Sequence, residues 1–213
     1  KDQSYFLFAT TQEQLDFLRF PLGEVESKED VTRKHAERLE LCVMNKPDSQ
    51  DICFVPDGNY ARFLEQRLDA GQMTPGEVVD QAGQVLGTHG GIHRFTVGQR
   101  RGLGLGGLAE PRYVTQIDAP SGRVTVGTQD QLKMRGLRAK EISWVSGEQP
   151  AEVRVSVKIR YRHTPIAATV VSRSNAAADV WFQDKHPAIT PGQAVVFYDD
   201  NQVLGGGWIE GPL

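Results

Sequence analysis

Apolar and polar residues alternate strictly through AEVRVSVKIRYRH, residues 151–163. Successive side chains of a β-strand point to opposite faces, so this pattern predicts a strand with one core face and one cationic face. The core face would carry Val153, Val155, Val157, Ile159 and Tyr161, and the cationic face Arg154, Ser156, Lys158, Arg160 and Arg162. Such a row of cations can follow a phosphate backbone, although basic strand faces are also common where they meet only water.

Further short apolar runs surround this stretch and are separated by turn residues. ATVVS, ADVWFQ, QAVVFY and QVLGGGWI follow it, and together they predict an all-β unit, a small closed barrel. Upstream lie GEVVDQAGQVLG, HRFTVGQRRG and RYVTQIDAPSGRVTVG, with Gly or Pro at intervals of about 8 to 12 residues. These runs predict antiparallel hairpins in a small β-rich module over residues 70–136.

The first 70 residues favour short helices instead. Thr10-Thr11 with Glu13 and Gln14 has the spacing of a capping box, ahead of an apolar stripe at Leu15 and Leu18 that Pro21 would end. The same signal returns at Ser27 and Asp30, before Val31 and Leu39. A third helix would be capped by Asp57 or Asn59 and would carry Tyr60, Phe63 and Leu64 on one face.

Composition describes an ordinary globular chain. Its 213 residues are 39% hydrophobic and 24% charged. No stretch approaches the roughly 18 uninterrupted apolar residues of a membrane span, and the start lacks the layout of a signal peptide. We therefore expect a cytoplasmic protein that does not enter a membrane.

The net charge of −3 conceals an uneven distribution. Residues 91–163 carry 13 Lys and Arg against 6 Asp and Glu, whereas residues 1–90 carry 9 against 16 and residues 164–213 carry 2 against 5. A basic block of this kind attracts polyanions such as nucleic acid, but it is equally compatible with a solvated surface.

Two motifs have the spacing of a ligand site without its context. GLGLGG, residues 102–107, satisfies G-x-G-x-x-G, yet Pro111 follows closely and no β-α-β unit surrounds it. We expect these glycines to let the protein backbone come close to a partner or to make a sharp turn. The flanking Gln99, Arg100 and Arg101 make RNA backbone a candidate for that partner. His89 and His93 stand four residues apart, but Gly90 and Gly91 oppose a helix there, so we expect no zinc site.

The two cysteines, Cys42 and Cys53, are too few for a disulfide scaffold. Cys42 follows a helical pattern in LELCVM and favours a buried position. The apolar neighbours of Cys53 also favour burial, yet its run of four residues ends at Pro56-Asp57-Gly58, ahead of a short helix. A strand end, a turn and a helix start can present a nucleophile and lower its thiol pKa. From these residues alone, both interpretations of Cys53 stay open.

Six motifs in register resemble one family. KDQSYFL, FPLGE, DSQDICFVPDG, GQRRGLGLGG, KIRYR and TPGQAVVFYD are similar, in this order, to the second half of the tRNA-specific 2-thiouridylases, the bacterial MnmA family. The resemblance covers essentially the whole chain. It implies an α+β multidomain fold with three parts. Residues 1–57 would form the tail of a Rossmann-like α/β ATP-pyrophosphatase domain, 58–136 a small β-rich central domain, and 137–213 a C-terminal antiparallel β-barrel.

The resemblance also implies a reaction and its residues. ATP, with Mg, adenylates the wobble uridine of tRNA at its C2 carbonyl oxygen, a cysteine persulfide then delivers sulfur to that carbon, and AMP leaves. Cys53 in the ICF motif corresponds to the persulfide carrier. The tRNA contacts would be Lys1, Asp2, Gln3, Arg160, Tyr161 and Gln193. The partners would be the tRNA anticodon loop and a sulfur donor protein of a cysteine desulfurase or persulfide relay, with the protein acting as a monomer.

Two expected features of the family are missing from these residues. The glycine-serine ATP loop is absent, as is the upstream cysteine that closes a disulfide with the persulfide carrier, and the setting of Cys42 does not match that cysteine. We therefore expect a fragment that binds no ATP or metal and cannot modify tRNA alone, yet binds it. The main alternative is a non-catalytic β-barrel RNA-binding module with a buried structural cysteine. A thiol oxidoreductase is disfavoured because no C-x-x-C occurs.

Overall fold

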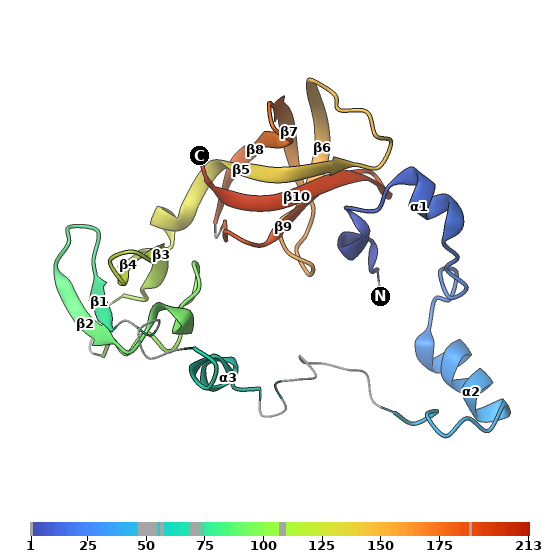
Figure 1. Cartoon of the computed structure of the whole chain (residues 1–213), viewed down its shortest axis with the longest axis horizontal. Coiled ribbons are helices and arrows are strands. Elements are labelled where there is room, and N and C mark those ends of the chain that lie inside the picture. Colours follow the sequence, from blue (N-terminus) through green and yellow to red (C-terminus); the bar gives the residue numbers. More distant parts are fainter. Residues whose placement is uncertain are drawn as a thin grey trace.

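The structure is a computed structural model that describes residues 2–46, 55, 58–68, 73, 75–106, 110–187 and 189–213. Figure 1 shows an arm of short helices, a small sheet and a barrel, with the sheet and the arm on opposite sides of the barrel. The arm contains η1 (Ser4–Leu7), α1 (Gln12–Phe17), η2 (Lys28–Arg33) and α2 (Lys34–Arg38). The short helix α3 (Tyr60–Glu65) lies nearer the sheet.

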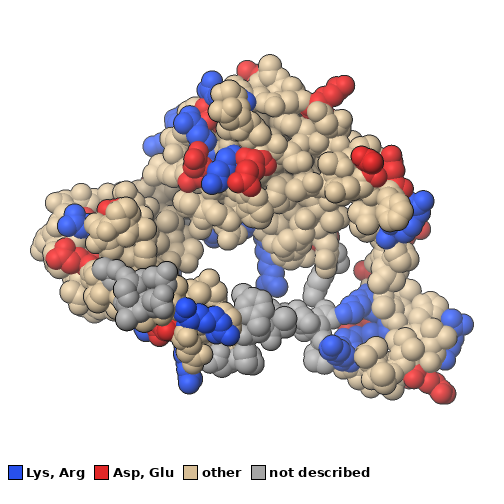
Figure 2. Space-filling view, viewed as in Figure 1, with Lys and Arg blue, Asp and Glu red and all other residues tan. Residues whose placement is uncertain are grey.

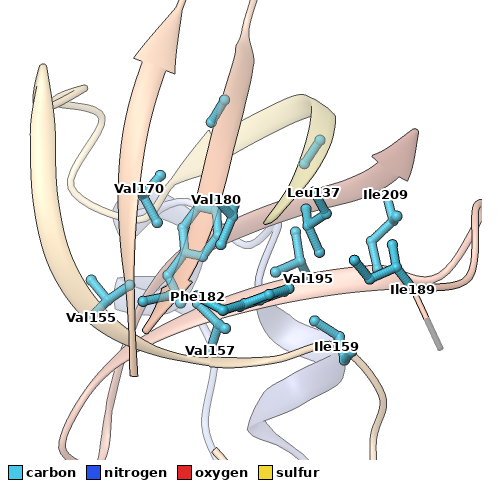
Figure 3. Packing of buried hydrophobic residues seen from close by; sticks show 14 of the residues in the cluster. Leu137, Val155, Val157, Ile159, Val170, Val180, Phe182, Ile189, Val195 and Ile209 are labelled. Carbon is cyan, nitrogen blue, oxygen red and sulfur yellow. The ribbon is translucent and has the colours of Figure 1, made fainter. Parts of the chain in front are cut away.

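Six strands close into an antiparallel barrel in the order β10-β5-β8-β7-β6-β9, which confirms the predicted closed barrel. The strands are β5 (Lys133–Trp144), β6 (Glu152–Lys158), β7 (Ile166–Arg173), β8 (Ala177–Pro187), β9 (Ala194–Asp199) and β10 (Gln202–Pro212). Figure 3 shows their inward side chains, such as Val157, Val180 and Val195, meeting in one core. Closure leaves no unpaired strand edge within the barrel.

The predicted strand over residues 151–163 is correct at its start and wrong at its end. Val155 and Val157 are buried in the barrel core while Arg154 is exposed, as the alternation predicts. However, β6 ends at Lys158, and the chain then bends through residues 159–162. Arg160 and Arg162 therefore project from a turn and do not extend a row of cations along the strand.

The small sheet has the order β2-β1-β4-β3. Its strands are β1 (Gly76–Val79), β2 (Val85–His89), β3 (Tyr113–Asp118) and β4 (Arg123–Gly127). The hairpins β1-β2 and β3-β4 are antiparallel, as predicted, and β1 of the first hairpin pairs in parallel with β4 of the second. The run HRFTVGQRRG is not a strand. Its first two residues belong to a 3-10 turn, η4 (Ile92–Arg94), and Phe95 in the run and Leu103 directly after it are buried in the core beneath the sheet.

The glycines of GLGLGG act within this core. Gly102 and Gly104 have φ of +72° and +70°, a left-handed backbone that glycine adopts without strain. Leu103 between them packs beneath the sheet, together with Leu105. Residues 101–106 contain no helix, so no helix that could hold a dinucleotide phosphate opens in the described part of this motif.

The predicted helix caps are present, but the predicted apolar stripes of the arm are not buried. Thr11 and Gln14 form a reciprocal capping box, and the side chains of Ser27 and Asn59 accept hydrogen bonds from the backbone of Asp30 and Arg62. The helix at Thr11 ends at Phe17, four residues before Pro21. Helices this short have little face to bury, and the arm leaves large apolar side chains in contact with water: Phe17, Leu18, Phe20, Leu22, Val31, Leu39, Leu41 and Val43.

Asp179 on β8 is a buried charge that ties three barrel strands together. Its side chain is only 2% exposed, and its carboxylate accepts a hydrogen bond at 2.8 Å from Arg138 Nε of β5. Arg173 Nη2 of β7 lies 2.8 Å from the other carboxylate oxygen. The hydrogen bonds from Arg138 and then Arg173 hold the pKa of Asp179 below its ordinary 3.8, against the opposing effect of burial.

We expect Asp179→Asn to destabilise the barrel by about 2 kcal/mol near neutral pH, because the charge-assisted hydrogen bonds from Arg138 and Arg173 are lost while both half-exposed arginines regain water. Since the folded-state pKa is depressed, this stabilisation is present above pH 3.8 and is lost as the pH falls through the lower folded value. Urea unfolding of both proteins at about pH 7 and about pH 3 measures the difference. An equal difference at both pH values would contradict the assignment to Asp179.

Candidate nucleic-acid interface

The N-terminal segment docks on the outside of the barrel. Tyr5 and Phe8 are buried against Ala194, Val196 and Tyr198 of β9. The alternate β9 residues Val195 and Phe197 lie in the barrel interior. Strand β9 is therefore covered on both faces, which explains its unbroken apolar sequence AVVFY.

A glycine on β10 makes this docking possible. A Cβ atom at Gly206 would lie 2.5 Å from the Val195 carbonyl oxygen and 2.9 Å from Cδ2 of Phe8. No larger residue fits there without displacing the Phe8 ring or the strand. Gly206 in the GGG stretch of QVLGGGWI thus leaves the space in which Phe8 of the N-terminal segment packs on the barrel surface.

Polar contacts fix the same segment. Tyr5 Oη donates a buried hydrogen bond of 2.8 Å to the Ala194 carbonyl, and Ser4 Oγ lies 3.3 Å from Tyr198 Oη. Burial raises the pKa of Tyr5 to about 12, Tyr198 acts in the same direction, and Arg160 opposes both. Tyr5 is consequently a neutral hydrogen-bond donor at physiological pH.

Asp2 pairs with a cation of the barrel. Its carboxylate accepts a hydrogen bond of 2.8 Å from Ser4 N and one of 3.1 Å from Lys158 Nζ. Hydrogen bonds from Ser4, followed by those from Lys158, lower the pKa of Asp2. Lys158 is only 17% exposed and also lies over the Tyr198 ring at 4.9 Å. The middle of the predicted cationic face is therefore engaged by the protein itself.

Arg160 and Tyr161 lie directly beyond the end of β6. Arg160 is exposed, and its Nη2 donates a hydrogen bond of 3.0 Å to Thr190 Oγ1. The Tyr161 ring is centred 6.1 Å from the ring of Tyr5 and 4.7 Å from that of Phe6. The turn after β6 is thereby held against the N-terminal segment.

Gln193 belongs to the turn that starts β9. Gly192 and Gln193 exchange backbone hydrogen bonds with Ile209 of β10, at 2.9 and 2.8 Å, and the side chain of Gln193 is exposed. Its neighbour Ala194 accepts the hydrogen bond from Tyr5, and Thr190 of the same turn accepts from Arg160. The structure thus brings together the segments that carry five residues predicted as tRNA contacts: Asp2, Gln3, Arg160, Tyr161 and Gln193. Lys1, the sixth, lies outside the described residues.

Thr190 joins this face to the rest of the molecule. It is buried, and its hydroxyl accepts from Arg160 and donates to the carbonyl of Val97 at 3.4 Å. Val97 belongs to the segment that connects the two hairpins of the small sheet. The sequence did not single out Thr190, Tyr5 or Phe6, although each stands in a motif, TPGQ or KDQSYFL, that contains a predicted contact.

The electrostatic character of the face comes from lysine and arginine and not from histidine. Figure 2 shows Lys and Arg side chains bordering the hollow beneath the barrel. His163 follows Arg162, and burial lowers its pKa, with Arg160 acting in the same direction. His163 is therefore neutral at pH 7, and its neighbours supply the positive charge.

Cys53, the predicted sulfur carrier, lies outside the described residues, whereas Val55 and residues 58–68 after it are described. Val55 is buried, and its carbonyl accepts a hydrogen bond of 3.0 Å from Gly58 N. Gly58 has a φ of +64°, and Asn59 then caps α3. The predicted chain reversal and helix start therefore follow Cys53 in the chain.

The prediction that Cys42 is buried was wrong, because Cys42 is exposed. The helix α2 ends at Arg38, and Glu40 adopts a left-handed φ of 51°. The chain consequently turns before it reaches Cys42, and none of the buried core clusters of the described residues contains that residue.

The two histidines at metal-ligand spacing have protein partners. His89 Nε2 lies 2.9 Å from the Gly122 carbonyl, while its Nδ1 accepts from Gly91 N at 3.1 Å. His93 Nε2 lies 3.0 Å from Glu65, which also pairs with Arg94. Within the described ranges, no group of three or more His, Cys, Asp or Glu side chains could hold a metal ion.

None of the described helices has the length and apolar character needed to cross a membrane.

A separate cavity of about 360 Å³ opens between the β5-β6 loop and the β9-β10 hairpin. Trp144, Leu204 and Gln12 are among its lining residues. None of the described residues predicted to contact tRNA lines it, so this cavity is distinct from the face built by the N-terminal segment.

Three family models match the chain in succession. They are described as a tRNA methyl transferase HUP domain over residues 1–57, a tRNA methyl transferase PRC-barrel domain over residues 61–128, and an aminomethyltransferase β-barrel domain over residues 134–209.

Curated relatives carry the name tRNA-specific 2-thiouridylase MnmA. The chain is 49% identical to that of Ruegeria pomeroyi, with 98% of this chain and 56% of the relative covered. It is 50% identical to that of Paramagnetospirillum magneticum, with 98% and 55% covered, and 48% identical to that of Geobacter metallireducens, with 100% and 57% covered. The chain spans about half the length of the curated relatives it matches.

We expect Tyr5→Phe to loosen the N-terminal segment without disturbing the barrel, because the ring stays while the buried hydrogen bond to Ala194 is lost. A cost of about 1 kcal/mol corresponds to roughly fivefold faster hydrogen exchange in residues 2–8. Tyr60→Phe, at an exposed tyrosine of α3, is the matched control. Unchanged exchange in Tyr5→Phe would show that the hydrogen bond does not hold the segment.

Proposed function

The chain belongs to the family of tRNA-specific 2-thiouridylases. From this premise we propose that it binds the tRNA and carries the sulfur in tRNA 2-thiolation. The reaction replaces the oxygen at C2 of the wobble uridine with sulfur. One observation carries the proposal for RNA: segments separated by more than 150 residues along the chain meet on a single face, where Asp2 pairs with Lys158 beside Arg160.

The described residues have side chains that can bind the phosphates, riboses and bases of an anticodon loop. The exposed Arg160 can turn part of its guanidinium to a phosphate, and lysine and arginine around the hollow supply long-range attraction. Gln193 carries an amide that both donates and accepts hydrogen bonds, which suits base edges and ribose hydroxyls alike. Gln3 offers the same amide chemistry from the N-terminal segment. Tyr161 contributes an aromatic ring with a polar end.

Asp2 acts indirectly in this proposal. Its carboxylate repels phosphate, so we assign it the role of orienting Lys158 and not that of a direct backbone contact. Lys1 precedes it and remains a proposed contact on the strength of the family motif alone.

Cys53 is the proposed sulfur carrier. Its thiolate would take a sulfur atom from a donor protein of the cysteine desulfurase or persulfide relay type and hold it as a persulfide. The outer sulfur would then form the bond to C2 as the activated oxygen leaves. The upstream cysteine that the family resemblance implies for a full-length protein would attack the Cys53 sulfur, break the S–S bond and form a disulfide with Cys53, leaving the outer sulfur on C2. A reversal and a helix start just after the cysteine suit the presentation of a thiolate.

ATP, with Mg, is the co-substrate that the family resemblance implies for a full-length protein, where it would activate the departing oxygen. The described residues do not fit it, because none of them forms a glycine-rich loop between a strand and a helix. We therefore assign no residue of this chain to ATP and derive no step through it.

We propose the same three-part division for this chain that the sequence predicts, with residues 1–57 as the tail of an ATP-pyrophosphatase domain, 58–136 as a central domain and 137–213 as the barrel. We further propose that the protein acts as a monomer in the cytoplasm, on a single tRNA at a time.

We expect Arg160→Ala to weaken tRNA binding by the chain roughly fivefold and to reduce the slope of log affinity against log salt by about one, because one phosphate contact is removed. Arg154→Ala is the control, since Arg154 is also exposed but lies within β6, six residues before Arg160 in the chain. Filter binding at several salt concentrations gives both quantities. Equal effects of the two substitutions would argue for diffuse attraction and against this face.

We expect Cys53→Ser to abolish 2-thiouridine formation in a full-length family member that carries these 213 residues, whereas Cys42→Ser leaves it intact. Mass spectrometry of nucleosides after incubation with ATP, tRNA and a persulfide donor measures the product. Full activity of Cys53→Ser would favour the alternative, a non-catalytic RNA-binding module with a packed cysteine.

A further inference from the structure

We propose that Phe6 and Tyr161 form a stacking platform for an unpaired nucleobase, a proposal that rests on the RNA-binding function proposed above. Phe6 is 61% exposed although it follows the buried Tyr5 directly. Its ring centroid lies 4.7 Å from that of Tyr161, with 39° between the ring planes. A large apolar ring left open to water beside a second ring is a surface that a planar base can cover.

Contacts with neighbouring residues hold the Phe6 ring in place. Phe6 lies in η1, where its backbone N donates to the Gln3 carbonyl at 3.0 Å. The Tyr5 ring meets Phe6 edge-on, with centroids 5.5 Å apart and planes at 89°, and Tyr5 is anchored to β9 by its hydrogen bond. A ring that is already ordered loses little conformational entropy when a base stacks on it.

The charges around the platform favour a nucleic acid as its occupant. Arg160 and Arg162 flank Tyr161 in the chain, and both are exposed. The nearby acid Asp2 is already paired with Lys158. An aromatic surface flanked by exposed cations is the arrangement by which proteins hold single-stranded nucleic acid, with bases on the rings and phosphates on the cations.

The other exposed phenylalanines lack this combination. Phe17 is 87% exposed, and Phe20 is also exposed, but in the described part of the chain neither has a ring contact. Phe17 lies in a helix with no buried residue, so nothing orders its ring as Tyr5 and Tyr161 order Phe6. Phe17 is therefore a matched control for the loss of an exposed phenylalanine.

The experiment uses the 213-residue chain and a short RNA hairpin with an anticodon loop, in which 2-aminopurine replaces each loop base in turn. We expect binding to quench the fluorescence at one or more loop positions, because 2-aminopurine loses fluorescence when it stacks. Phe6→Ala should remove that quenching and weaken binding about tenfold, within the range for one base on one aromatic ring. The salt dependence should not change, since no phosphate contact is lost.

Three further variants separate stacking from folding. Phe6→Tyr should retain the quenching and Phe6→Leu should lose it, although leucine keeps an apolar side chain at this position. Phe17→Ala should match the wild type. Thermal unfolding of every variant at the wild-type midpoint would show that the segment remains folded.

The results distinguish the platform from the function on which it rests. If the wild-type chain binds the RNA but Phe6→Ala or Phe6→Leu retains the quenching and the affinity, the platform is wrong and the RNA-binding face stands. If Phe6→Ala and Phe17→Ala weaken binding equally, Phe6 has no special role and the platform is again wrong. If the wild-type chain does not bind the hairpin at all, both proposals fail.

Discussion

The burial of β9 on both of its faces is the constraint on which the rest of the structure depends. Val195 and Phe197 fill the barrel, while Ala194, Val196 and Tyr198 lie under Tyr5 and Phe8 of the N-terminal segment. Burying apolar area on both faces stabilises the strand and the segment together. It also carries residues from the start of the chain to the barrel turns that begin β9 and follow β6. Without this contact, the residues predicted to touch tRNA would belong to two unrelated surfaces.

The barrel strands and the helix caps were predictable because their sequence signals are local. Alternation over residues 151–157, turn residues between apolar runs, and the side-chain caps at Thr11, Ser27 and Asn59 each act within a few positions of the chain. The long strand β5 was not predicted, because charged residues and a glycine interrupt the apolar pattern in its sequence KMRGLRAKEISW. Gly136 in that strand accommodates Trp181, whose ring would lie 2.8 Å from an added Cβ. A contact of this kind is decided by a residue far along the chain.

The errors have a common physical origin in tertiary contacts. The early end of β6 and the exposure of Cys42 both depend on what packs against these segments, and no short-range pattern encodes that. Family motifs identified the residues of the candidate site, and the structure shows which of them are neighbours. The pairing of Asp2 with Lys158 and the role of Thr190 became visible only in three dimensions.

The hydroxyl of Thr190 has a mechanical consequence. It is shared between a guanidinium on the barrel and a carbonyl of the segment that leads between the two hairpins of the small sheet. An anion that draws Arg160 away takes one partner from this oxygen, and a rotation of the small sheet takes the other. Among the described residues, this hydroxyl therefore links the position of Arg160 to the joint between the two modules.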